Sequence, residues 1–199
     1  MVYTPGVAIS DITRHDTAPA APGELELLQR FLNLHVHDER DRHVDPPLEM
    51  LQAFLVERGL LREGERVTEA DRETYLRLRG AVRDMIEAGG RAPMSRRHAK
   101  TLDEIAVDAS LHPHFHAAQP PTLEPRGSGV AAAFGTMVSI AFVSTFDGSF
   151  EHLRLCADET CRAIFYDRSK NHSGRWCSMA TCGNRAKVRA WRERRRSEA

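Results

Sequence analysis

The chain has 199 residues and is 41% hydrophobic, so it is long enough to bury one substantial core. Its 28 basic and 28 acidic residues give a formal net charge of zero, which excludes a uniformly basic or acidic protein. The charge is divided unevenly, because residues 150–199 carry twelve Lys or Arg and six Asp or Glu. That segment has a net charge of +6 and residues 1–149 have −6, so we expect a local basic face suited to a polyanionic partner.

Residues 1–22 are rich in Pro, Ala, Thr and Asp and show no apolar periodicity, so they predict an irregular N-terminal arm. The arm lacks the basic start and apolar run of a secretory signal. We therefore expect a cytoplasmic protein, in which cysteine thiols stay reduced.

The first predicted helix starts near Glu24, where apolar residues begin to recur at helical spacing. Two histidines, His35 and His37, follow at its end. A polar helix end is the commoner explanation of such histidines, but a metal, acid–base or small-ligand role stays open. These two residues are the candidates for an N-terminal pocket that would bind a small-molecule effector.

Two further helices have clear end signals. The second is expected to have Asp45 as its N-cap, Pro46 at its first position and Gly59 as its stop. Thr68 with Asp71 three residues later resembles a capping box, which opens a third helix that runs to about residue 88 and ends at a Gly-Gly pair.

A fourth helix is predicted from Ser95 to about residue 109, and a short hairpin follows near residues 111–126. Its first strand would place His112, His114 and His116 on one side, because side chains of a strand repeat every second residue. Three imidazoles on one face suggest a metal site. Polar residues on an exposed strand are the simpler explanation, and the sequence pairs no carboxylate with them.

Residues 129–146 form the most apolar stretch of the chain. A membrane span needs about 20 mostly apolar residues, whereas this run is shorter and contains Gly135, Thr136 and Ser139. We therefore predict the central core helix of the protein and no membrane contact.

All four cysteines lie near the C-terminus, as the pairs Cys156/Cys161 and Cys177/Cys182. Two C-x4-C pairs separated by fifteen residues are typical of a structural zinc site, because tetrahedral Zn²⁺ takes four thiolates most easily as two local pairs. Two disulfides are the alternative, and a reducing compartment argues against them. Four thiolates close the coordination sphere, so we predict one structural Zn²⁺ with no open catalytic position.

Two short strands are predicted at residues 153–156 and 162–166, and a basic helix is expected from about Ser178 onward. Its arginines recur every three or four residues, so they share one helix face, and guanidinium groups suit phosphates and guanine edges. The predicted nucleic-acid-binding residues are Arg185, Lys187, Arg189, Arg192, Arg195 and Arg196 of this helix, with Lys170 and Arg175 of the preceding loop. A helix that only solubilises the chain, or that contacts the acidic N-terminal half, is the alternative.

The run from Trp176 to Lys187 contains Cys182-Gly183-Asn184-Arg185 and, with the cysteine pair upstream, resembles the CGNR zinc-finger family. In that family the finger follows an N-terminal domain called ABATE, which is described as part of stress-induced transcription regulators. The resemblance thus implies a four-cysteine zinc finger, a role in transcription regulation under stress and DNA as the partner. It covers the finger closely and the preceding domain only loosely, through the order of its helices.

These patterns together predict an α+β, mainly helical fold in three parts. In this prediction, residues 1–22 form an irregular arm, and residues 23–149 form an ABATE-like helical domain that includes a hairpin near residues 111–126. Residues 150–199 form a finger with a short hairpin and a basic helix.

The leading hypothesis is a DNA-binding transcription regulator whose N-terminal domain senses a ligand or dimerises. A homodimer is expected because one short helix buries too little surface for specific binding. The second hypothesis is a protein-interaction or RNA-binding adaptor with the finger as scaffold, and the third is a small-ligand binder or enzyme. The sequence shows no nucleophile motif, phosphate loop or paired catalytic carboxylates, so we expect no enzyme.

Overall fold

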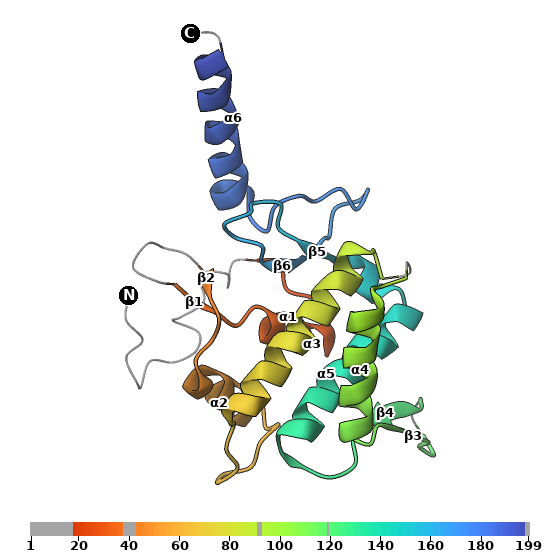
Figure 1. Cartoon of the computed structure of the whole chain (residues 1–199). Coiled ribbons are helices and arrows are strands. Elements are labelled where there is room, and N and C mark those ends of the chain that lie inside the picture. The colour runs from red at the N-terminus through yellow and green to blue at the C-terminus, as the bar shows by residue number, and fades with distance from the viewer. Residues whose placement is uncertain (1–17, 38–42, 91–92, 119, 198–199) are drawn as a thin grey trace.

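The computed structural model describes residues 18–37, 43–90, 93–118 and 120–197, so most of the predicted N-terminal arm lies outside the described residues. The described chain forms a helical body, three two-stranded antiparallel sheets and a C-terminal helix that projects from the body (Figure 1). This arrangement confirms the predicted α+β, mainly helical fold.

The helical body is built around the ring of Phe31. Its five helices are α1 (Leu25–Leu32), α2 (Leu48–Glu57), α3 (Glu69–Glu87), α4 (Arg96–Asp108) and α5 (Gly129–Phe146). The Phe31 ring centroid lies 5.7 Å from Phe54 of α2 and 5.0 Å from Tyr75 of α3. It also lies 5.8 Å from Phe134 of α5. One aromatic side chain therefore joins four of the helices in a single core.

Helix α5 is the core helix that its apolar sequence predicted. It is long and apolar enough to cross a membrane by length and composition, but 61% of it is buried inside the structure. Its close packing against the end of α4 depends on Gly135, where an added Cβ would lie 2.3 Å from the Cβ of Ala109. Phe142 and Phe146 at the end of α5 stay exposed.

The ends of α3 and α4 follow the predicted signals, whereas the start of α2 does not, and Pro46 is not its first residue. The capping box of Thr68 and Asp71 is present before α3. At the start of α4, the side chain of Ser95 accepts a hydrogen bond from the backbone N–H of His98. The predicted N-cap of α2 is wrong, because α2 begins after Pro47. The carboxylate of Asp45 instead accepts a hydrogen bond from Arg79 at 2.9 Å, so a partner on α3 holds it.

Three short hairpins complete the fold. They are formed by β1 (Val36–His37) with β2 (His43–Val44), β3 (His112–His114) with β4 (Thr122–Glu124), and β5 (Leu153–Leu155) with β6 (Ile164–Tyr166). The second is the hairpin predicted near residues 111–126, and the third contains the two strands predicted for the finger. A short 3-10 helix, Ser149–His152, connects α5 to β5.

The strands β5 and β6 pack directly on the helical body. Asn33, just after α1, donates to the carbonyl of Ile164 and accepts from its N–H, both at 2.8 Å. Leu153 and Ile164 are fully buried in the same apolar cluster as the helices. Arg83 of α3 donates to the carbonyl of Arg162 at 2.8 Å. The base of the finger is therefore part of the main core.

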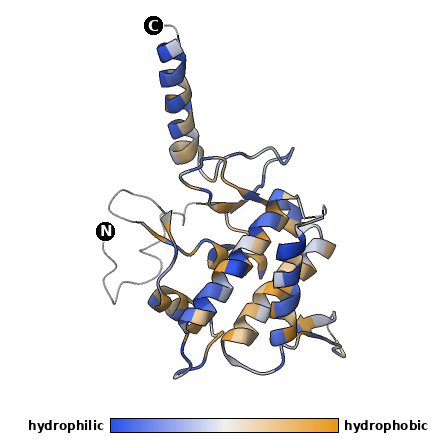
Figure 2. Ribbon diagram, viewed as in Figure 1, coloured by the Kyte–Doolittle hydropathy of each residue, from blue (hydrophilic) through white to orange (hydrophobic). Residues whose placement is uncertain are grey.

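The last two elements are a π-helical turn, η3 (Met179–Gly183), and the basic helix α6 (Asn184–Ser197). The sequence predicted one continuous helix from Ser178, whereas Ser178 caps the π-helical turn by accepting from Thr181 N–H. Helix α6 contains no buried residue and is mostly hydrophilic along its length (Figure 2).

Candidate metal centre and basic helix

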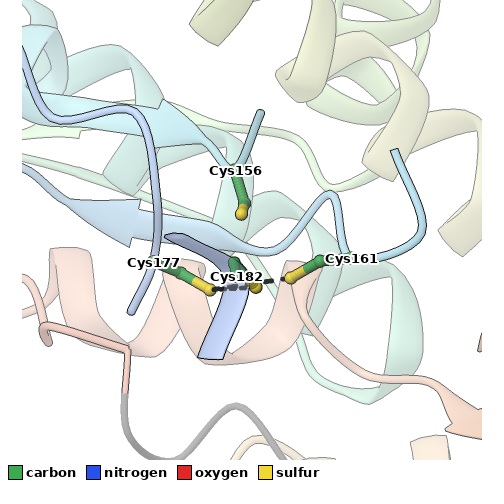
Figure 3. A group of neighbouring side chains, drawn as sticks. All are labelled: Cys156, Cys161, Cys177 and Cys182. Atoms are coloured by element: carbon green, nitrogen blue, oxygen red, sulfur yellow. Dashed lines mark hydrogen bonds between the residues drawn. The ribbon is translucent and has the colours of Figure 1, made fainter. Parts of the chain in front are cut away.

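The four cysteines come together between the sheet of the finger and α6. Cys156 directly follows β5, Cys161 lies in the turn before β6, Cys177 precedes η3 and Cys182 lies within it. All four are buried, and their Sγ atoms lie within 4.8 Å of one another (Figure 3).

The spacing of the sulfur atoms fits a shared metal ion. Sγ of Cys177 lies 3.6 Å from Sγ of Cys161 and 3.6 Å from Sγ of Cys182. Two sulfurs bound tetrahedrally to Zn²⁺ at about 2.3 Å lie about 3.8 Å apart, whereas a disulfide needs about 2.05 Å. The four free thiols therefore fit one structural zinc ion and are not paired as disulfides.

The thiols of Cys156, Cys161 and Cys177 are close enough to shift one another's pKa values. Hydrogen bonds from Cys161 and Cys177 lower the pKa of Cys156 far below that of a free thiol. The same bond raises the pKa of Cys161 to about 12, and the bonds to Cys156 and Cys161 raise that of Cys177. A metal that binds these thiols takes them as thiolates and releases their protons.

The turn between the first two cysteines is organised by Asp158. Its backbone carbonyl accepts from the N–H of Cys161 at 2.8 Å, and its side chain accepts from the N–H and hydroxyl of Thr160. The carboxylate is fully buried. Burial alone would raise the pKa of Asp158, but the Thr160 hydrogen bonds and the charges of Arg185 and Arg189 bring it below its ordinary value. Asp158 is thus a buried anion at neutral pH.

The residues after Cys182 have distinct structural roles. Gly183 is packed so closely that an added Cβ would lie 2.8 Å from Sδ of Met179. The side chain of Asn184 donates to the carbonyl of Ala180 at 3.1 Å, so it bonds back onto η3. Arg185 donates to Sγ of Cys182 at 3.2 Å, and this bond raises the pKa of the guanidinium.

Two predicted nucleic-acid-binding arginines contact Asp158. Nε of Arg185 lies 3.1 Å from its Oδ2, and Nη2 of Arg189 lies 3.3 Å from its Oδ1. Each arginine is about half exposed, with side-chain exposures of 49% and 46%. Sequence reasoning missed Asp158, although it is an acidic residue within the first cysteine pair, because its partners lie about thirty residues further along the chain.

The other predicted basic residues lie on the exposed surface. Lys187, Arg192, Arg195 and Arg196 are exposed on α6, and Lys170 and Arg175 are exposed on the loop before Cys177. Two of these guanidinium groups stack on tryptophans. Arg195 lies 5.0 Å from the ring centre of Trp191, and Arg175 lies 5.3 Å from that of Trp176.

Of the two predicted pocket histidines, only His35 has a described side chain. His35 is buried, and its Nδ1 lies 2.6 Å from the carbonyl oxygen of Asn33. His37 is part of β1, and its side chain lies outside the described residues. A pocket of about 490 Å³ lies between α3, α4, α5 and β4. Its lining is mostly apolar and includes Met85, Leu102, Leu123, Val138 and Phe142.

Comparison with known proteins supports the finger directly. No curated protein matches the chain in sequence. The family model of the CGNR zinc finger matches residues 152–195, a segment that contains all four cysteines, the Asp158 turn and most of α6. With four buried thiols grouped around one position, residues 152–195 of the chain form a CGNR zinc finger.

Proposed function

We propose that the protein is a transcription regulator that binds duplex DNA through α6. The observation that carries this proposal is the position of the helix, which stands clear of the body and buries none of its residues (Figure 1). From Asn184 to Ser197 it carries seven Lys or Arg and one acidic residue. A helix that serves packing would bury an apolar face, whereas this one presents cations to solvent.

The dimensions of α6 suit the major groove. Its 14 residues give a length of about 21 Å, and the groove is about 12 Å wide and admits an α-helix. The turn η3, which contains Cys182, holds the start of α6, while Arg185 and Arg189 bind the helix to Asp158. The far end, with Arg192, Arg195 and Arg196, is then available for phosphates and base edges.

The preceding domain would supply regulation. We assign residues 23–149 to an ABATE-like domain that senses a small effector in a stress response, and the apolar pocket of about 490 Å³ supports an apolar effector. A cytoplasmic homodimer would place two basic helices on one operator, which compensates for the small surface that one helix buries.

A second function is favoured by Trp191. Its side chain is 51% exposed among the arginines of α6, and exposed aromatic rings stack on unpaired bases. An RNA-binding adaptor would use such a ring, whereas a duplex reader gains little from it. Relative affinity for duplex DNA and single-stranded RNA of equal length separates the two functions.

The test uses zinc-loaded protein and fluorescence anisotropy with a labelled mixed-sequence DNA duplex. The variant Arg192→Ala/Arg195→Ala/Arg196→Ala should weaken binding by about tenfold or more, because it removes three cations that can form charge-assisted hydrogen bonds to phosphates. The matched control, Arg96→Ala/Arg97→Ala/Lys100→Ala, removes the same charge from exposed positions of α4. Equal weakening by both variants would show that only net charge matters and would reject α6 as the binding surface.

A further inference from the structure

A second group of metal-ligating side chains lies far from the cysteines, on the β3–β4 hairpin. His114 and His116 come from the β3 side and Glu124 comes from β4. One ligand atom of each residue lies within 4.8 Å of the others. The sequence indicated the histidines but no carboxylate beside them, and the hairpin brings Glu124 next to them.

The strand register explains how the group forms. In the antiparallel pairing His112 faces Glu124 and His114 faces Thr122. Side chains two residues apart on a strand share a face, so the polar side chains of both strands gather on one side of the hairpin. Leu123 between them lies on the opposite side, where it lines the apolar pocket next to α5.

The distances agree with coordination of one ion. Nδ1 of His114 lies 3.0 Å from Oε2 of Glu124, and Nε2 of His116 lies 3.6 Å from Oε1. Two ligand atoms bound tetrahedrally at about 2.1 Å lie about 3.4 Å apart, which is between these values. The rings of the two histidines are also close, with centroids 4.3 Å apart.

The surroundings hold the ligands in place and leave access for a metal. Thr122 donates its hydroxyl to Oε1 of Glu124 at 2.6 Å and lies 2.8 Å from Nε2 of His116. Hydrogen bonds of this kind orient ligands before a metal binds. The side chains of His114 and Glu124 are 52% and 42% exposed, so an ion can enter and water can complete its coordination.

We propose that His114, His116 and Glu124 bind one divalent transition-metal ion, separately from the zinc of the four cysteines. Two imidazoles and one carboxylate suit Zn²⁺, Ni²⁺ or Fe²⁺, and the open positions distinguish this site from the closed four-cysteine site. The hairpin is joined to the wall of the apolar pocket, because Ser139 of α5 donates a hydrogen bond to the carbonyl of Leu123. A metal bound to the hairpin would therefore fix it at this wall. The proposal does not depend on DNA binding by α6.

The test is calorimetric titration of ZnCl₂ into full-length protein that already carries its one structural zinc. The site predicts one additional zinc per chain. His114→Gln, His116→Gln and Glu124→Gln should each weaken that binding by about tenfold or more, as expected when the ligands or their orientation are lost. Glu124→Gln keeps the size and an acceptor for Thr122, so its loss of affinity reports coordination and not hairpin unfolding.

His112→Gln is the matched control, because it changes the same residue type on the same strand. The His112 ring centroid lies 6.5 Å from that of His114, outside the group of three ligands. This variant should bind the second zinc like the wild type. A stoichiometry that stays at one zinc per chain, or an equal loss of affinity in His112→Gln, would overturn the proposal.

Discussion

The buried carboxylate of Asp158 lies 3.3 Å from the guanidinium of Arg189. This ion pair joins the turn between Cys156 and Cys161 to the middle of α6. The two residues are 31 positions apart in sequence. Asp158 also contacts Arg185 and holds the turn that presents Cys161. Asp158 therefore helps to hold α6 in the direction in which it leaves the finger.

Replacing Asp158 with Asn should destabilise the finger by about 1–3 kcal/mol, because two arginines lose a buried charged acceptor. DNA affinity should fall as well, since α6 is no longer held at a fixed angle. Urea unfolding followed by tryptophan fluorescence measures the first effect. Glu159→Gln at the exposed neighbouring position is the control. Unfolding midpoints that coincide for the two variants would contradict this role of Asp158.

Replacing Cys177 with Ser should release zinc, because its sulfur lies 3.6 Å from two of the other three and metal binding supplies much of a finger's folding free energy. Both tryptophans of the chain, Trp176 and Trp191, lie in the finger, so their fluorescence reports its folding. We expect lower zinc content by atomic absorption and a red-shifted emission. Wild-type protein treated with a chelator should give the same spectrum. Full zinc content in the variant would contradict the assignment of the four cysteines as zinc ligands.

Replacing Tyr75 with Phe should cost about 1–3 kcal/mol of stability. The hydroxyl donates to the carbonyls of Phe31 and Leu34 at 3.1 and 3.2 Å in a fully buried position, and burial raises its pKa to about 12. Thermal unfolding by circular dichroism measures the loss. Tyr166→Phe, at a partly exposed position, should change stability much less. Equal effects would show that the two buried bonds contribute nothing specific.

Features that depend on neighbouring residues were predicted well from the sequence. The capping box of Thr68 and Asp71, the apolar helix at Gly129–Phe146 and the two cysteine pairs are all present. Each is signalled by residue types a few positions apart, so the sequence indicates it before the tertiary partners are known.

Features that depend on tertiary partners were missed or predicted wrongly. Asp45 has the right chemistry for an N-cap, but Arg79 of α3 takes its carboxylate. Asp158 and Glu124 gain their roles from residues that the fold brings alongside them. The apolar pocket is formed by four separate elements, so no single stretch of sequence indicated it.

Phosphate neutralisation by α6 is tested most directly by the salt dependence of duplex DNA binding. With zinc-loaded protein, a plot of log affinity against log salt should be linear, with a slope of about −0.9 for each phosphate neutralised. The Arg192→Ala/Arg195→Ala/Arg196→Ala variant should have a shallower slope, by about 0.9 for each phosphate that it no longer neutralises. No binding at low salt, or the same slope in wild type and variant, would show that α6 does not neutralise phosphates.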